Sequence, residues 1–103
     1  MKTFPMFLKM TGRRVVILGG GEQAAQKTRL ILKTEAEIVV AAPALDPELA
    51  ALAARGRITH APALTPDIFA GAALAFVATG DPAEDARLAG LARAAGILVN
   101  VVD

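Results

Sequence analysis

Hydrophobic residues of this chain occur in short continuous runs, separated by segments of mixed polarity. Short runs rich in valine and isoleucine are typical of strands that are buried on both faces of a sheet. They predict five strands, over Arg14–Leu18, Glu37–Ala42, Arg57–Ala61, Leu74–Ala78 and Ile97–Val101. The apolar segment 4–8, which a proline interrupts, predicts an extended lead-in that packs on the core.

The segments between the predicted strands carry helical signals. In Glu22–Lys33, residues suited to burial recur three and four positions apart, which predicts a helix that buries Ala24, Ala25, Thr28, Ile31 and Leu32. Three more helices are predicted to start at 46–48, 65–67 and 81–84, where an oxygen-bearing residue precedes proline, and to stop at Gly56, Gly71 and Gly96. Asp81 and Glu84 also have the spacing of a capping box.

Strands and helices alternate along the whole chain in this prediction. Strands joined by helical crossovers run parallel, so the pattern predicts an α/β fold of the Rossmann type, a doubly wound sheet with the strand order 3-2-1-4-5. The length of 103 residues suits one domain, over 1–103, and is too short for a complete two-domain dehydrogenase. In such a sheet the ligand crevice opens at the carboxyl ends of strands one and four.

A glycine-rich stretch follows the first predicted strand without an intervening turn residue. Gly19, Gly21 and Ala24 form the pattern GxGxxA, a permitted form of the dinucleotide-binding fingerprint. Gly21 would let a diphosphate approach the backbone, and the N–H groups at the helix start would bind it. We therefore predict a dinucleotide site that includes Gly19, Gly20, Gly21, Glu22 and Gln23.

Other candidate residues lie at the ends of later strands. The second strand ends at Pro43 without the usual carboxylate or an arginine, so Pro43 and Ala44 would contact the ribose through their backbone, and the choice between NAD and NADP stays open. Thr79 and Gly80 would lie beside the nicotinamide, although a plain turn capped by Asp81 is an alternative. Asn100 and Asp103 end the last strand, and Asp103 is either a polar strand end or a candidate acid or base.

Composition narrows the class of protein. Eleven basic and ten acidic residues give a formal net charge of +1, which argues against a nucleic-acid-binding surface. There is no cysteine, and His60 has no second ligand at metal-binding spacing, so no metal site is predicted. No secretory signal or membrane-spanning run is found, which favours a cytoplasmic location. The charges of Glu84, Asp85, Arg87 and Arg93 read as a solvated helix face.

Several of these motifs occur together in one known family. The chain resembles the N-terminal domain of siroheme synthase, the precorrin-2 dehydrogenase and sirohydrochlorin ferrochelatase family. The matching residues span the chain in the right order: Phe4-Pro5-Met6-Phe7, Leu18-Gly19-Gly20-Gly21 with Ala24, Lys27 and Arg29, Ala42-Pro43, Ala78-Thr79, and Asn100-Val101-Val102-Asp103. The glycine motif combined with Asn-Val-Val-Asp is more specific than either alone.

The resemblance implies an enzyme with NAD as its cofactor. Precorrin-2 would lose a hydride and a proton to become sirohydrochlorin, and ferrous iron would then be inserted into this tetrapyrrole. The family assigns the proton removal to the aspartate that matches Asp103. Family members tend to carry an asparagine where this chain has Asp85, and they continue into a helical region that forms a homodimer. A nucleotide-sensing regulatory module, which would need the glycine loop but not Asp103, is the alternative.

Overall fold

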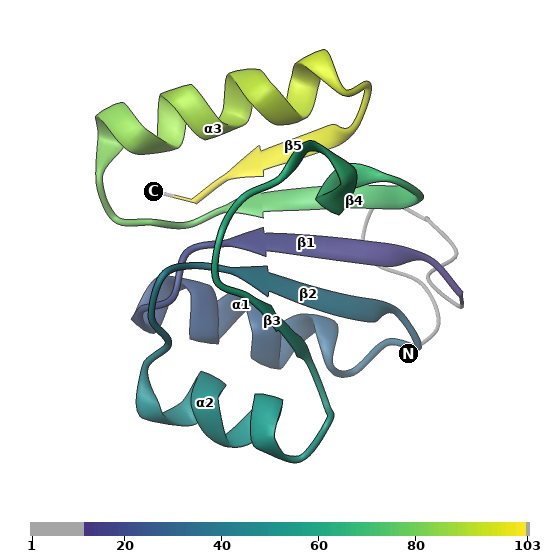
Figure 1. Cartoon of the computed structure of the whole chain (residues 1–103), viewed down its shortest axis with the longest axis vertical. Coiled ribbons are helices and arrows are strands. Elements are labelled where there is room, and N and C mark those ends of the chain that lie inside the picture. The colour runs from purple at the N-terminus through teal and green to yellow at the C-terminus, as the bar shows by residue number, and fades with distance from the viewer. Residues whose placement is uncertain (1–11, 103) are drawn as a thin grey trace.

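Five parallel strands form the central sheet of the computed structural model, which describes residues 12–102 (Figure 1). Their order is β3-β2-β1-β4-β5. The strands are β1 (Arg14–Leu18), β2 (Glu37–Ala41), β3 (Thr59–Ala61), β4 (Ala72–Val77) and β5 (Leu98–Val101). The predicted fold class and strand order are confirmed. The predicted lead-in over 4–8 lies outside the described residues.

Helices cover both faces of this sheet. The helices are α1 (Glu22–Ile31), α2 (Pro47–Ala54) and α3 (Pro82–Ala94), together with one short 3₁₀-helix, η1 (Pro66–Phe69). Figure 1 shows α1 and α2 below the sheet and α3 on its other side. The doubly wound arrangement packs these helices along the faces of the sheet, so that the loops that follow the strands lie at the carboxyl ends of the strands.

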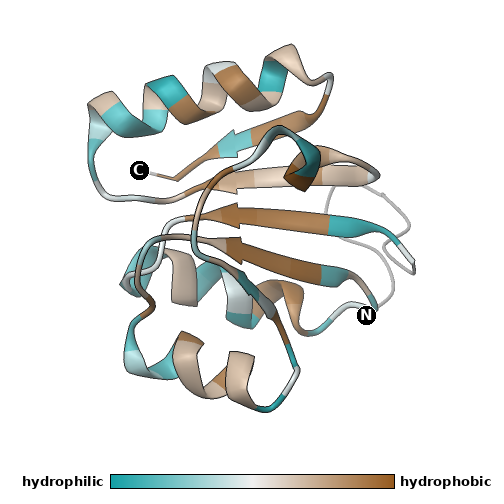
Figure 2. Cartoon of the chain, viewed as in Figure 1, coloured by the Kyte–Doolittle hydropathy of each residue, from teal (hydrophilic) through white to brown (hydrophobic). Residues whose placement is uncertain are grey.

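The alternation of side chains along each strand gives each face its own core. On β1, Val15 and Ile17 pack with residues of α1 and α2, whereas Val16 and Leu18 pack with residues of α3 and η1. All four side chains are at most 1% exposed. Because both faces of β1 are buried beyond Arg14, its following residues, 15–18, form a continuous apolar run (Figure 2).

The predicted start signals at Asp46 and Asp81 form the expected caps. Asp46 accepts a hydrogen bond from the Leu49 N–H at 2.9 Å, and Asp81 accepts one from the Ala83 N–H at 3.0 Å. The predicted capping box does not form, because the Glu84 carboxylate pairs with Arg87. The boundaries differ slightly from the prediction, since α1 ends two residues earlier and β3 begins two residues later.

The helix predicted from 65–67 is wrong in type. The segment forms only the single turn η1, in which the Ile68 N–H donates to the Thr65 carbonyl and the Ala70 N–H to the Asp67 carbonyl. Thr65 does not cap this turn with its side chain. Because Gly71, with φ of +73°, ends the turn and β4 already begins at Ala72, too few residues remain for an α-helix.

Truncating the centre of the core should destabilise the fold strongly. Ile17 is fully buried on the central strand, so Ile17→Ala should lower the free energy of unfolding by about 2–5 kcal/mol through lost burial and a cavity. Leu91→Ala is the control, because Leu91 is 44% exposed and its loss should change stability by less than about 0.5 kcal/mol. Urea unfolding measures both, and equal effects would contradict this core.

Candidate dinucleotide-binding site

The carboxyl ends of the central strands meet at one level. Leu18 of β1 is in register with Ala41 of β2 and with Val77 of β4. Beyond these residues, the Gly19 N–H donates to the Ala41 carbonyl at 2.9 Å and the Ala78 N–H donates to the Leu18 carbonyl at 2.8 Å. The loops that follow β1, β2 and β4 are therefore held together at the edge where the fold leaves an opening.

The first two glycines after β1 allow these loops to touch. Gly19 has φ of +140°, and a Cβ at this position would lie 2.2 Å from the Ala78 carbonyl oxygen. A Cβ at Gly20 would lie 2.0 Å from the Ala44 carbonyl oxygen. Real Cβ atoms do not approach backbone oxygen so closely, so both positions require glycine for the fold itself.

The third glycine is different. No atom lies within 4 Å of the position that a Cβ at Gly21 would take, and the backbone of Gly21 is extended, with φ of −100°. Nothing in the fold of the described residues therefore demands glycine here. Space beside Gly21 is what a ligand in contact with the backbone would need, so this residue passes the test of fit for a diphosphate.

The start of α1 lacks a side-chain cap. Its N-cap residue is Gly21, whereas α2 and α3 begin with aspartate caps. The first N–H groups of a helix have no partner within the helix, and its dipole places positive charge at this end. The Glu22 carboxylate in the first turn does not neutralise this positive end, because it forms an ion pair with Arg29 of the same helix. The exposed N–H groups can bind an anion.

A cleft of about 660 Å³ opens beside the glycine loop, on the side of β2 and β3. Most of the lining residues are apolar or glycine: Leu18, Gly19, Gly20, Gly21, Ala41, Ala42, Pro43, Ala44, Pro62, Ala63, Leu64, Thr79, Glu84, Arg87 and Leu88. The structure thus brings the predicted residues Pro43, Ala44 and Thr79 together with the three glycines. An apolar cleft of this kind suits a flat heterocycle such as adenine.

Sequence reasoning missed the segment 62–64, which forms one wall of the cleft. The segment follows β3 directly, as Pro43 follows β2, so its place after a parallel strand was the available signal. It also missed Arg87, whose guanidinium pairs with Glu84 at the cleft. Hydrogen bonding between them lowers the pKa of Glu84 and raises that of Arg87.

The end of β2 offers no carboxylate to a ribose. The Asp46 side chain caps α2, and its N–H donates to the Gly20 carbonyl at 2.8 Å. Glu48 pairs with Arg29 at 2.8 Å, and this hydrogen bond lowers the pKa of Glu48. The acidic groups near this loop therefore have partners within the protein, and the backbone around Pro43 and Ala44 remains for a ligand.

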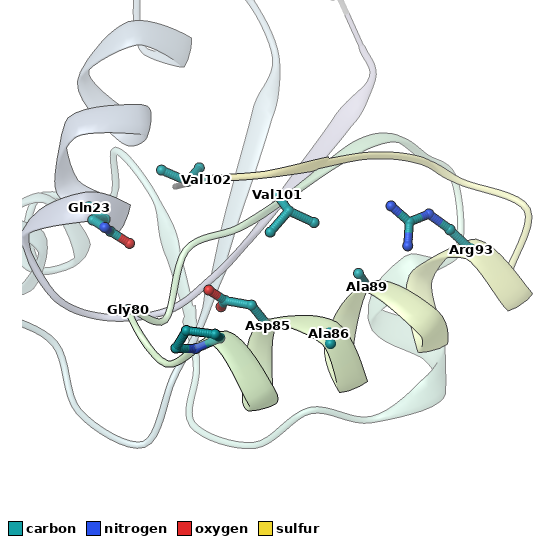
Figure 3. A pocket seen from close by; sticks show the side chains of 9 residues that line it. Gln23, Gly80, Asp85, Ala86, Ala89, Arg93, Val101 and Val102 are labelled. Atoms are coloured by element: carbon teal, nitrogen blue, oxygen red, sulfur yellow. The ribbon is translucent and has the colours of Figure 1, made fainter.

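A second pocket, of about 400 Å³, lies on the other side of the glycine loop, between α3 and β5. Its lining comprises Gln23, Gly80, Pro82, Asp85, Ala86, Ala89, Arg93, Val101 and Val102 (Figure 3). The Oε1 atom of Gln23 is buried and has no hydrogen-bond partner among the described residues. A buried amide end without a partner costs free energy unless a ligand or water binds it, so Gln23 marks this pocket as a binding position.

The interpretation of Asp85 as part of a solvated face is wrong. Its residue is only 5% exposed, and its Oδ1 accepts hydrogen bonds from the Thr79 N–H at 2.9 Å and the Thr79 hydroxyl at 2.6 Å. Asp85 lies in the first turn of α3, directly against the loop that follows β4. Both hydrogen-bond donors of Thr79 are thereby used within the protein. Thr79 can therefore contact a ligand but has no N–H or O–H left to donate to it.

Of the residues predicted at the end of the last strand, Asn100 lies outside both the cleft and the second pocket. Asn100 is exposed on β5, whereas Val101 and Val102 line the second pocket. Asp103 lies outside the described residues. His60 contacts the Ala42 carbonyl oxygen through Nε2 at 2.7 Å, which is a structural role.

Residues 12–102 contain neither a cluster of metal ligands nor a membrane-spanning helix. No three histidine, aspartate or glutamate side chains in this range are grouped so that they could hold a metal ion. None of the helices in the same range has the length and apolar character needed to span a bilayer.

Comparison with known proteins agrees with the geometry. Residues 6–103 match a family described as "Putative NAD(P)-binding". The chain belongs to this family of NAD(P)-binding domains, which confirms the class of ligand predicted from the glycine motif.

The individual relatives are more specific. The chain is 47% identical to siroheme synthase of Chromobacterium violaceum and 40% identical to that of Methylobacillus flagellatus, in each case over 100% of this chain and 22% of the relative. It therefore spans about a fifth of the length of these relatives. Among solved structures, SirC, a precorrin-2 dehydrogenase, matches with a TM-score of 0.72 and 25% identity, over 95% of this chain and 48% of that one. The resemblance to the siroheme synthase family is confirmed.

Alanine at two neighbouring glycines should separate folding from binding. Gly20→Ala should lower the free energy of unfolding by about 1–3 kcal/mol, because its methyl group would overlap the Ala44 carbonyl. Gly21→Ala should fold normally, since its methyl group meets no protein atom, but should bind NAD at least about tenfold more weakly because the diphosphate needs that space. Thermal melts and calorimetric titration measure the two effects. Unchanged NAD affinity in Gly21→Ala would exclude this loop as the diphosphate site.

Proposed function

We propose that this chain is the NAD-binding domain of an enzyme that oxidises precorrin-2 to sirohydrochlorin in siroheme biosynthesis. One observation carries the proposal. The uncapped start of α1 faces the open space beside Gly21, between an apolar cleft and a pocket with an unpartnered polar group. The identity with siroheme synthases supports the choice of substrate, and the 48% coverage of SirC supports a role as one domain of a longer protein.

Each part of the site has a role in this proposal. The backbone N–H groups of 20–23 bind the diphosphate, because the Gly19 N–H already donates to the Ala41 carbonyl, and the positive end of α1 stabilises its charge. The cleft lined by Pro43, Ala44 and 62–64 takes the adenosine half, and the pocket lined by Gln23 and Gly80 takes the nicotinamide half. When bound, NAD supplies the acceptor for the hydride that the substrate loses.

A proton must leave the substrate together with the hydride. We assign this proton to the carboxylate of Asp103, as the family resemblance implies. The preceding residues Val101 and Val102 line the pocket to which we assign the nicotinamide half, which supports this choice of residue. A carboxylate there would act as a general base.

NAD is proposed as the cofactor in preference to NADP. A 2′-phosphate is usually bound by an arginine near the end of β2, and residues 40–44 contain none. The arginine at the cleft, Arg87, is paired with Glu84, and Arg29 is paired with Glu22 and Glu48. These pairs leave no cation among the described residues free at the expected ribose position.

Other functions implied by the resemblance remain predictions. They comprise insertion of ferrous iron into sirohydrochlorin, assembly as a homodimer and a cytoplasmic location. Each needs a measurement on the longer protein, namely iron uptake by sirohydrochlorin, mass in solution and fractionation of cells.

Cofactor and substrate tests examine the proposal separately. Calorimetric titration of the chain should detect NAD binding, with NADP binding at least about tenfold weaker because its extra phosphate lacks a cationic partner. In the longer protein, Asp103→Asn should slow precorrin-2 oxidation at least about a hundredfold and leave the NAD dissociation constant unchanged, as expected for loss of a general base. Absorbance of sirohydrochlorin measures this rate.

Two results would contradict the proposal. Absence of NAD and NADP binding would remove the dinucleotide site. NAD binding by a longer protein that does not oxidise precorrin-2 would favour the nucleotide-sensing module, in which Asp103 has no chemical role.

A further inference from the structure

Asp85 is a buried carboxylate to which the proposed reaction assigns no role. It lines the second pocket and is only 5% exposed. Its Oδ1 accepts both hydrogen bonds that Thr79 donates, one from the N–H and one from the hydroxyl. Figure 3 shows the Asp85 carboxylate and the Gln23 amide directed into the same space from two sides of the pocket.

No cation in the described part of the chain forms an ion pair with Asp85. Arg93 also lines the pocket, but it lies eight positions further along α3, which corresponds to roughly 12 Å of helix. The two groups of Thr79 that donate to Asp85, an N–H and a hydroxyl, are neutral and do not cancel the charge of a carboxylate. Among the described lining residues, Asp85 therefore places its carboxylate at the Gln23 end of the pocket and Arg93 lies at the other end.

We propose that Asp85 makes this pocket prefer the oxidised form of the cofactor, and so determines which redox state the site retains. The inference rests on the proposed function, in which the nicotinamide half occupies this pocket. The nicotinamide ring of NAD⁺ carries a positive charge. It loses that charge when it accepts a hydride, which brings two electrons and one proton, while the second proton of the substrate goes to the general base.

A fixed carboxylate distinguishes these two states by electrostatics alone. It attracts the charged ring and has no such attraction for the neutral ring, whereas the adenosine and diphosphate halves are the same in both forms. The carboxamide group is also common to both forms and can pair with the buried end of Gln23. Asp85 should therefore change the ratio of the two affinities, and Gln23 should not.

Substitution of Asp85 by its neutral isostere tests the inference in binding measurements. Asp85→Asn keeps the shape of the side chain and an oxygen that can accept from Thr79. For one unit charge several ångströms away in a partly hydrated pocket, the NADH to NAD⁺ ratio of dissociation constants should fall about threefold to tenfold. Calorimetry with NAD⁺ and fluorescence with NADH measure the two constants without any turnover.

The control is Glu35→Gln, which changes the net charge equally. Glu35 is exposed in the turn before β2, at the opposite edge of the sheet, so the ratio should stay within about twofold of the original. A second variant, Ala86→Lys, adds a positive charge at an exposed position of the pocket lining and leaves the Thr79 contacts intact. It should lower the ratio in the same direction, and if Asp85→Asn fails to fold, an unchanged ratio in Ala86→Lys would still overturn the inference.

The outcomes separate this inference from the proposed function. A lower ratio in Asp85→Asn, with Glu35→Gln unchanged, supports the inference, and an unchanged ratio in Ala86→Lys overturns it. Equal weakening of both cofactor forms, at an unchanged ratio, would show that Asp85 only supports the Thr79 loop and would overturn the inference while leaving the proposed function intact. Failure of the original chain to bind either form would instead overturn the proposed function.

Discussion

The close approach of three backbone segments at the end of β1 is the constraint on which the site depends. Carbonyl oxygens of Ala78 and Ala44 stand where side chains of Gly19 and Gly20 would otherwise be. This contact allows β1 to pass directly into α1, and it holds the loops after β2 and β4 against the start of that helix. A larger side chain at either position would force the loops apart, and the cleft and the pocket would lose a shared wall.

The same contact explains why the site has two unlike halves. The glycine loop and the start of α1 form a central position whose chemistry is that of backbone N–H groups. On one side lies an apolar cleft, and on the other a pocket with Gln23 and Asp85. This arrangement matches a ligand with an anionic centre and two flat rings of different polarity, which is the chemical plan of a nicotinamide dinucleotide.

The general fold was readable from the sequence because its signals are local. A strand that is buried on both faces of the sheet needs a continuous apolar run. The helices that start after Asp46 and Asp81 are capped by these aspartates. The order of these elements then determines a parallel sheet. The segment at Thr65 has the same kind of start signal, yet it forms only η1, because too few residues remain before β4 for an α-helix.

The polar half of the site was less readable because burial is a property of the assembled fold. The other charged residues of α3, at positions 84, 87 and 93, are all at least partly exposed. The sequence alone therefore predicts that Asp85 is exposed as well. Its burial depends on Thr79, which belongs to another loop and supplies both hydrogen bonds. A buried carboxylate held only by neutral donors keeps its charge available to the pocket. That charge, and not the glycine motif, is what can distinguish one state of a bound ring from another.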